Sequence, residues 1–150
     1  MGMTLSFTRA TSEQLDRAYE DPEWAAEFLW EDDVPGCYLD KAWAGIQFLL
    51  DEAEVPVDVY EDGNLIDEEC VMFGWDPDMV ADAARALRDM PFATLAGHYN
   101  AEKMMAADVY PRIWADDSEL DYLRTNYESL VAFFTETAAA GHGAIRNFSF

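Results

Sequence analysis

The end of the chain carries the pattern that most restricts its fold: a long helical repeat followed at once by a strand pattern. Apolar residues recur at spacings of three and four over residues 120–138, which predicts an amphipathic helix of about five turns. Ser118 and Asp121 are expected to cap its start, and Gly141 is expected to end it. Residues 144–150 (AIRNFSF) then alternate apolar and polar side chains, as a half-buried strand does. A helix that leads directly into a terminal strand needs a pairing partner elsewhere in the chain.

The first residues of the chain are the expected partner, because residues 3–8 also favour a strand. Helices are predicted to start near residues 11, 21, 39, 76, 92 and 103, a short strand is predicted at 70–73, and an extended segment at 55–60. A hydrophobic fraction of 51% in 150 residues suffices for one core. The sequence therefore predicts an α+β fold: a mostly helical single domain over residues 1–150, with a small sheet that includes the N-terminal and C-terminal strands.

The stretch Leu39–Leu50, LDKAWAGIQFLL, is predicted to form the central core helix, since its apolar residues follow helical spacing. Asp40 is its expected N-cap. Lys41 lies at the positive end of the same helix, where a cation is mildly unfavourable. We therefore expect Lys41 to pair with a carboxylate.

Acidic residues dominate the charge of the chain: 31 Asp plus Glu against nine Lys plus Arg give a formal net charge of -22. A negative field opposes binding to nucleic acid phosphates and to anionic membranes, so neither is an expected partner. Three origins of the acidity remain open. They are a solvated surface that maintains solubility, an adaptation to high salt, and an acidic face that engages a basic protein partner.

The two cysteines, Cys37 and Cys70, lack the spacing of a metal site. No apolar run approaches the roughly 20 residues that span a bilayer, and the first residues do not resemble a signal peptide. These observations predict a cytoplasmic protein with two reduced thiols. Cys37 follows a Pro-Gly pair and would be reactive if it lay at a helix start.

One acidic stretch resembles part of a calcium-binding loop. Asp58, Asp62 and Glu69 fall at the first, fifth and twelfth positions of such a loop. Tyr60 stands where the third-position ligand is required, and a proline interrupts the helix that should precede the loop. A solvated acidic turn is the competing interpretation.

Motifs for catalysis are missing from the sequence: it has no nucleophile elbow, no glycine-rich phosphate loop and no spaced metal ligands, so no cofactor is expected. His98 fits a hydrogen-bonded boundary residue better than a catalytic base. The five tryptophans are expected to be core residues first. Trp30 and Trp75, each beside acidic turn residues, are the two candidates for a pocket rim or an interface.

Four stretches carry a resemblance to a known family: MGMTLSF, LDKAWAGIQFLL, VYPRIW and LVAFFTETAAAGHGAIRNFSF. In this order, and with the Asp40-Lys41-x-Trp43 and Tyr110-Pro111 signatures, they resemble the YfbM-like family, a bacterial group of unknown function. The resemblance implies one α+β domain and brings no established reaction, cofactor or catalytic residue. Members often carry a histidine in the helix signature where this chain has Gln47, which forms hydrogen bonds but does not titrate near neutral pH.

These features favour a non-catalytic binding or protein-interaction domain that acts through an acidic surface and a pocket beside Trp43. Its sharper form is an inhibitor- or immunity-like protein that covers a basic site. The alternative is an enzyme with an unrecognised active site near the Asp40–Gln47 helix, which requires Asp40, Gln47, His98 and Tyr110 to converge in one cleft. The ligand or interface candidates are Asp40, Lys41, Trp43, Gln47, Trp30, Trp75, His98 and Tyr110.

Overall fold

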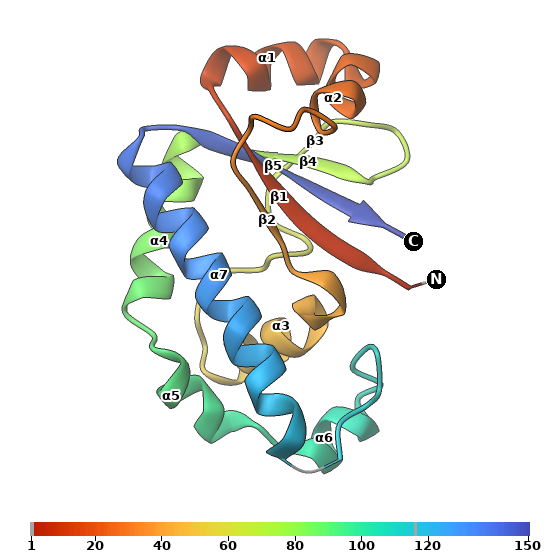
Figure 1. Cartoon of the computed structure of the whole chain (residues 1–150), viewed down its shortest axis with the longest axis vertical. Helices are drawn as coiled ribbons and strands as arrows, with labels where there is room; N and C mark the ends of the chain where they lie inside the picture. Colours follow the sequence, from red (N-terminus) through yellow and green to blue (C-terminus); the bar gives the residue numbers. More distant parts are fainter. Residues whose placement is uncertain (1, 116) are drawn as a thin grey trace.

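The protein is built around a five-stranded antiparallel sheet with helices on both faces (Figure 1). The structure is a computed structural model that describes residues 2–115 and 117–150. Its elements, in chain order, are β1 (Thr4–Ala10), α1 (Ser12–Glu20), α2 (Pro22–Phe28), β2 (Gly36–Tyr38), the 3₁₀ turn η1 (Asp40–Ala42), α3 (Trp43–Glu52), β3 (Asn64–Leu65), β4 (Met72–Trp75), α4 (Pro77–Arg88), α5 (Phe92–Leu95), η2 (Ala96–His98), α6 (Ala101–Ala106), η3 (Asp117–Glu119), α7 (Leu120–Ala139) and β5 (Gly143–Ser149). The predicted α+β class is confirmed. Within the described ranges, no helix is long and apolar enough to cross a membrane.

The two ends of the chain form the centre of the sheet, whose strand order is β2-β1-β5-β4-β3. β1 and β5 pair along their whole length, from Thr4 opposite Ser149 to Ala10 opposite Gly143. Figure 1 accordingly shows both termini close together on the same side of the molecule. The prediction that the terminal strands pair with each other is confirmed.

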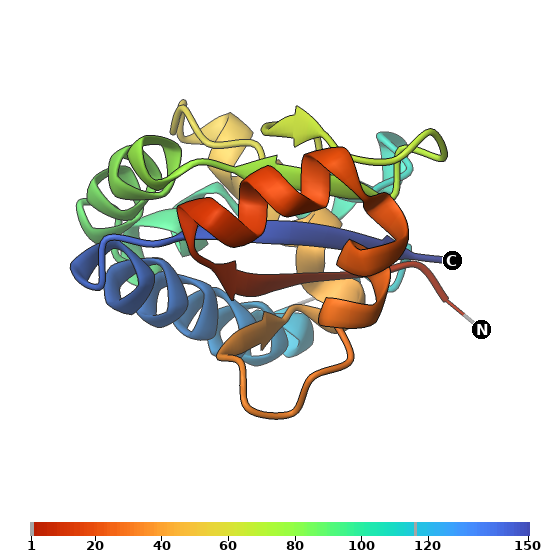
Figure 2. The ribbon, with the colours of Figure 1, turned by 90° about the horizontal axis from the view of Figure 1, so that it is seen from above.

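The two faces of the sheet are packed differently, because alternate residues of a strand point to opposite faces. On one face, Leu5, Phe7 and Phe148 join the larger core with α3, α4 and α7. On the other face, Met72 and Ile145 join a smaller core with α1 and α2, which lie over the sheet in Figure 2. The sheet is thus the middle layer of three.

Helix ends follow the local sequence where the cap lies within one turn. Thr11 Oγ1 accepts a hydrogen bond from the Gln14 amide N–H (3.1 Å), and Gln14 Oε1 accepts one from the Thr11 N–H (2.9 Å), which together form a capping box at the predicted helix start. Gly141 ends α7 with φ +73°, and the N–H groups of Gly141 and His142 bond to carbonyl groups of the last turn. This helix stop is the predicted one.

The predicted cap at the start of α7 is wrong. The helix begins at Leu120, after η3, and no side chain caps it. The Ser118 hydroxyl donates a hydrogen bond to Glu119 Oε1 (3.2 Å). The first turn of α7 is reached through a 3₁₀ turn, so the positions expected for the cap are shifted.

The strand predicted at residues 70–73 forms two residues later, as β4. Asp67 Oδ1 accepts hydrogen bonds from the N–H groups of Val71 (3.0 Å) and Met72 (2.8 Å), and Cys70 has a φ of +59°. The carboxylate therefore extends the turn, and the ladder begins only at Met72.

Candidate functional site

A cavity of about 330 Å³ opens beside α3, where this helix meets the loop before β3 and the segment after α6. We call it the Trp43 cleft. It is lined by Trp43, Ala44, Gln47, Phe48, Asp51, Asp58, Tyr60, Glu61, Asp108, Val109 and Tyr110. Three of the candidate residues from the sequence, Trp43, Gln47 and Tyr110, thus share one cavity.

An aromatic stack forms one wall of the cleft. The ring of Trp43 stacks on Tyr60, with centroids 5.2 Å apart and planes 19° apart, and on Tyr110 at 6.1 Å and 28°. The backbone of Met3 holds two of these rings: its carbonyl accepts a hydrogen bond from Trp43 Nε1 (3.0 Å), and its N–H donates to the Tyr110 hydroxyl (2.9 Å). Phe148 meets Trp43 edge-on at 5.5 Å. The wall is therefore fastened to the central strands.

Gln47 shapes the floor of the cleft and is 9% exposed. Its Nε2 donates to the Val57 carbonyl (3.0 Å) and to Asp51 Oδ1 (2.8 Å), while its Oε1 accepts from the Val59 N–H (2.9 Å). The Gln47 side chain therefore satisfies backbone groups of the segment around Val57. This explains why the predicted extended segment 55–60 does not pair with a strand of the sheet. Gln47 is committed to the fold.

Four carboxylates line the cleft, from Asp51, Asp58, Glu61 and Asp108, whereas no Lys, Arg or His is among its lining residues. Asp58 Oδ1 accepts from the N–H groups of Tyr60 (2.9 Å) and Glu61 (2.8 Å), and Asp108 lies 3.1 Å from Arg112. Within the described part of the chain, the Glu61 carboxylate has no hydrogen-bond or ion-pair partner. The Arg146 guanidinium lies 5.1 Å from the centre of the Tyr60 ring and interacts electrostatically with Asp58, so the uncompensated negative charge of the cleft is that of Glu61.

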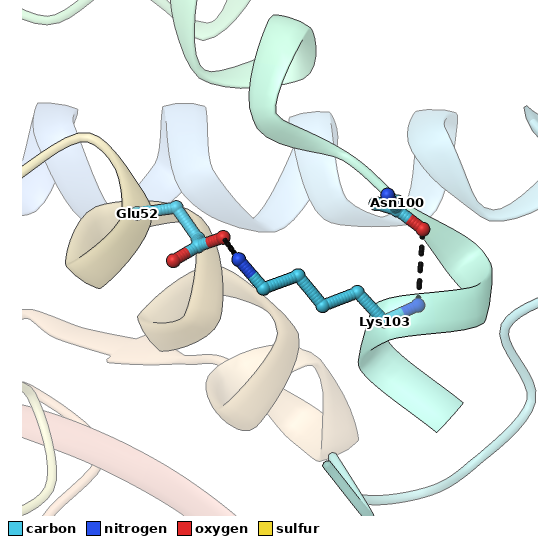
Figure 3. A network of polar contacts seen from close by, with 3 residues as sticks. All are labelled: Glu52, Asn100 and Lys103. Atoms are coloured by element: carbon cyan, nitrogen blue, oxygen red, sulfur yellow. Dashed lines mark hydrogen bonds and ion pairs between the residues drawn. The ribbon is translucent and has the colours of Figure 1, made fainter. Parts of the chain in front are cut away.

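One ion pair links the two helical segments that border the cleft. Lys103 of α6 pairs with Glu52 at the end of α3, and its backbone N–H donates to Asn100 Oδ1 (3.0 Å), which caps α6 (Figure 3). Glu52 lies at the negative end of α3, where a carboxylate is mildly unfavourable for its own helix. Its carboxylate instead pairs with Lys103 of α6, at an exposed position where such a pair contributes about 1 kcal/mol or less.

The three residues considered for calcium do not form a site. Asp62 Oδ2 accepts from the Asp58 N–H (2.9 Å), so both residues serve their own turn, whereas Glu69 lines a different cavity. In residues 2–115 and 117–150, no group of three or more His, Cys, Asp or Glu side chains is positioned to hold a metal. The geometry gives the calcium interpretation no support.

Asp40 and Lys41 lie outside the cleft, and both expectations about them are wrong. Asp40 has a φ of +52° and does not cap α3; its carboxylate accepts from the Tyr122 hydroxyl (2.8 Å), which in turn accepts from the Lys41 N–H (3.1 Å). Burial and the adjacent Asp40 raise the pKa of Tyr122. The exposed Lys41 side chain lies over Gly2, and no carboxylate of the described residues is within salt-bridge distance of it.

The remaining candidates are dispersed. His98 is exposed at the end of η2 and is not a lining residue of the cleft. Trp75 is 1% exposed and meets Phe7 edge-on in the core; it backs a third hollow without reaching the surface, so it is not the rim residue we predicted. Cys37 is buried in β2, and burial raises the pKa of its thiol to about 12, which makes it a poor nucleophile.

A second cavity, of about 620 Å³, lies on the sheet face that α1 and α2 cover. We call it the Trp30 groove. It is lined by Thr4, Ser6, Ala26, Leu29, Trp30, Tyr38, Asp67, Glu69, Val71, Met72, Asn147, Phe148 and Ser149. Trp30 is 85% exposed at its edge, as expected of a rim residue.

Several lining residues were not singled out in the sequence. Tyr60 and Glu61 are neighbours in the loop before β3, whereas Asp108 follows α6, and no local pattern connects the two segments. Ser6 and Asn147 did have a signal, because they are the polar positions of two alternating terminal strands.

Comparison with known proteins agrees with the fold. The model of the family described as Domain of unknown function (DUF1877) matches residues 1–146. The structure is similar to that of a protein of unknown function, YfbM from Escherichia coli, with a TM-score of 0.71 and 13% sequence identity over 97% of this chain and 99% of that chain. No curated protein matches the chain. The predicted resemblance to YfbM-like proteins is confirmed.

Proposed function

Because the chain belongs to the DUF1877 family, whose description assigns no activity, we propose its function from its own site: non-catalytic capture of a basic protein partner. In this proposal a lysine or arginine side chain of the partner enters the Trp43 cleft. The observation that carries the proposal is the composition of the cleft, with four carboxylates, an aromatic wall and no cationic lining residue.

The chemistry of the cleft suits a cation. Ammonium and guanidinium groups are attracted to the faces of Trp and Tyr rings, by about 0.5–1 kcal/mol at exposed sites and more where water is excluded. Tyr60 is 37% exposed at the mouth of the cleft, next to the unpaired Glu61. The aliphatic part of a long basic side chain would pack on Phe48 while its charged end meets the carboxylates.

The charge of the whole chain supports the same proposal. A net charge of -22 attracts a basic protein over long distances and accelerates the encounter, especially at low ionic strength. Rapid capture of a basic surface is the property that an inhibitor- or immunity-like protein requires. Both cysteines are free thiols, which supports a cytoplasmic location as part of this proposal.

The enzyme alternative draws no support from the site. It required four residues in one cleft, but Asp40 bonds to Tyr122 outside the cleft, and His98 is exposed elsewhere. Gln47 is in the cleft, but both the Nε2 and the Oε1 of its amide form hydrogen bonds with the backbone of Val57 and Val59.

The test uses short peptides that carry one lysine or one arginine, with an otherwise identical norleucine peptide as the uncharged match. We expect the basic peptides to shift the backbone amide signals of the cleft in NMR titrations, with an affinity that falls as salt is added. Tyr60→Leu and Glu61→Gln should each weaken this binding. Glu136→Gln, the same charge change at an exposed position of α7 outside the cleft, should not.

Equal binding of the norleucine peptide, or wild-type binding by both cleft variants, would refute a cation site in the cleft. The partner itself is tested separately, by capture from lysate at low and high salt with the wild-type protein and with Tyr60→Leu. A partner retained equally by both proteins would show that capture does not use the cleft.

A further inference from the structure

The floor of the Trp30 groove is a patch of neutral polar side chains from the two central strands. Thr4 pairs with Ser149 and Ser6 pairs with Asn147 across the β1–β5 ladder. Directly opposite residues, and residues two apart in a strand, point to the same face of a sheet. The four side chains therefore form a two-by-two patch, and all four line the groove.

These side chains are not used by the fold. None of the four forms a hydrogen bond with the described part of the chain, although Thr4, Ser6 and Asn147 are half-buried. Hydroxyl and carboxamide groups both donate and accept hydrogen bonds. A complementary ligand must therefore present donors and acceptors close together, without requiring a charge on the protein.

The residues that line the groove disfavour an anionic ligand and a second copy of the chain. No Lys, Arg or His lines it, and Asp67 and Glu69 stand at one side, so an anionic ligand is opposed. A second copy of the chain is opposed as well, because each copy has a net charge of -22. Asp67 is committed to two backbone N–H groups, which leaves the neutral floor as the main hydrogen-bonding surface.

Two aromatic residues border this floor. Trp30 is 85% exposed and Tyr38 is 61% exposed, so neither is held in place by burial of its ring. Aromatic faces carry partial negative charge and attract weakly positive C–H groups, such as those on one face of a saturated ring. The groove volume of about 620 Å³ lies within the range of about 300–1,000 Å³ that small-molecule sites occupy.

From this arrangement we infer that the Trp30 groove is a second binding site, for a neutral, hydroxyl-rich ligand of the saccharide class. The C–H face of a sugar ring packs on Trp30 or Tyr38, and its hydroxyl groups bond to Ser6, Asn147 and their neighbours. The inference rests on the groove alone and does not depend on the Trp43 cleft.

The experiment is an NMR titration of the whole protein with glucose, galactose, mannose, N-acetylglucosamine and cellobiose at millimolar concentrations. We expect at least one sugar to shift the amide signals of residues 4–6 and 147–149. Trp30→Ala and Asn147→Ala should weaken that binding by about tenfold or more. Leu65→Ala is the matched control, because Leu65 is an exposed apolar residue (52%) that does not line the groove.

Three results would overturn the inference. They are the absence of shifts at the groove with every sugar, shifts there that depend on protein concentration and so report pairing of two copies, or shifts caused by the lysine peptide and not by sugars. The Tyr60→Leu variant should bind sugars as the wild type does. Failure at the groove is thereby separated from failure at the cleft.

Discussion

Replacing Gln47 with leucine tests whether one side chain holds the loop that forms the floor of the Trp43 cleft. Leucine fills a similar volume but leaves the Val57 carbonyl and the Val59 N–H without their partners. Both valines are buried, so water reaches these groups only if the loop moves. The change therefore isolates the hydrogen bonds from the packing.

The expected cost follows from those two groups. A buried polar group without a partner costs about 1–3 kcal/mol, and the exposed neighbours Pro56 and Tyr60 let the loop relax toward water. We therefore expect Gln47→Leu to lower the free energy of unfolding by about 2–4 kcal/mol. For a chain of this size, that is a fall of about 5–15 °C in Tm. Urea unfolding followed by tryptophan fluorescence measures the free energy directly.

The control is Gln14→Leu, at the other glutamine of the chain. Gln14 Oε1 accepts one hydrogen bond, in the capping box of α1, so its loss should cost only about 0.5–1.5 kcal/mol. If Gln47→Leu were no more destabilising than Gln14→Leu, the bonds of Gln47 would not hold the loop. Basic peptides should also bind less well to Gln47→Leu, because the loop carries Tyr60.

Two further outcomes follow from single residues. Burial raises the pKa of the Cys37 thiol from 9.0 to about 12, so the stability that its neutral form supplies is complete below pH 9 and is lost as the pH rises toward 12. Cys37→Ala should therefore reduce, by about 1 kcal/mol, the unfolding free energy that the protein loses between pH 8 and pH 10; an unchanged pH profile would contradict this. Gly141→Ala should cost about 1 kcal/mol in thermal unfolding, because φ is +73° and no atom lies within 4 Å of the added Cβ. Gly97→Ala, with equally open space and no such φ, should be neutral or stabilising, and equal effects of the two changes would refute the conformational argument.

The aspartates show where local patterns fail. Asp21 caps α2 at the predicted helix start, with its carboxylate accepting a hydrogen bond from the Trp24 N–H (3.1 Å). Asp40 has an equally good sequence context, yet it bonds to Tyr122, which is 82 residues away. A cap competes with any other donor that the fold brings near, and that donor is invisible in the local sequence. The local sequence also misled the prediction for Lys41, because no carboxylate of the described residues pairs with it.

The sequence by itself determined the features that depend on neighbours within about one turn or two strand positions. These are the long helix α7 with its stop at Gly141 and the pair of alternating terminal strands. The net charge of -22 follows from composition alone. Only the tertiary structure decided the sites. It placed Tyr60, Glu61 and Asp108 beside Trp43, and it paired Ser6 with Asn147. The physical reason is range: periodicity and caps arise from short separations along the chain, whereas a cavity is made by side chains that meet only after the core has packed.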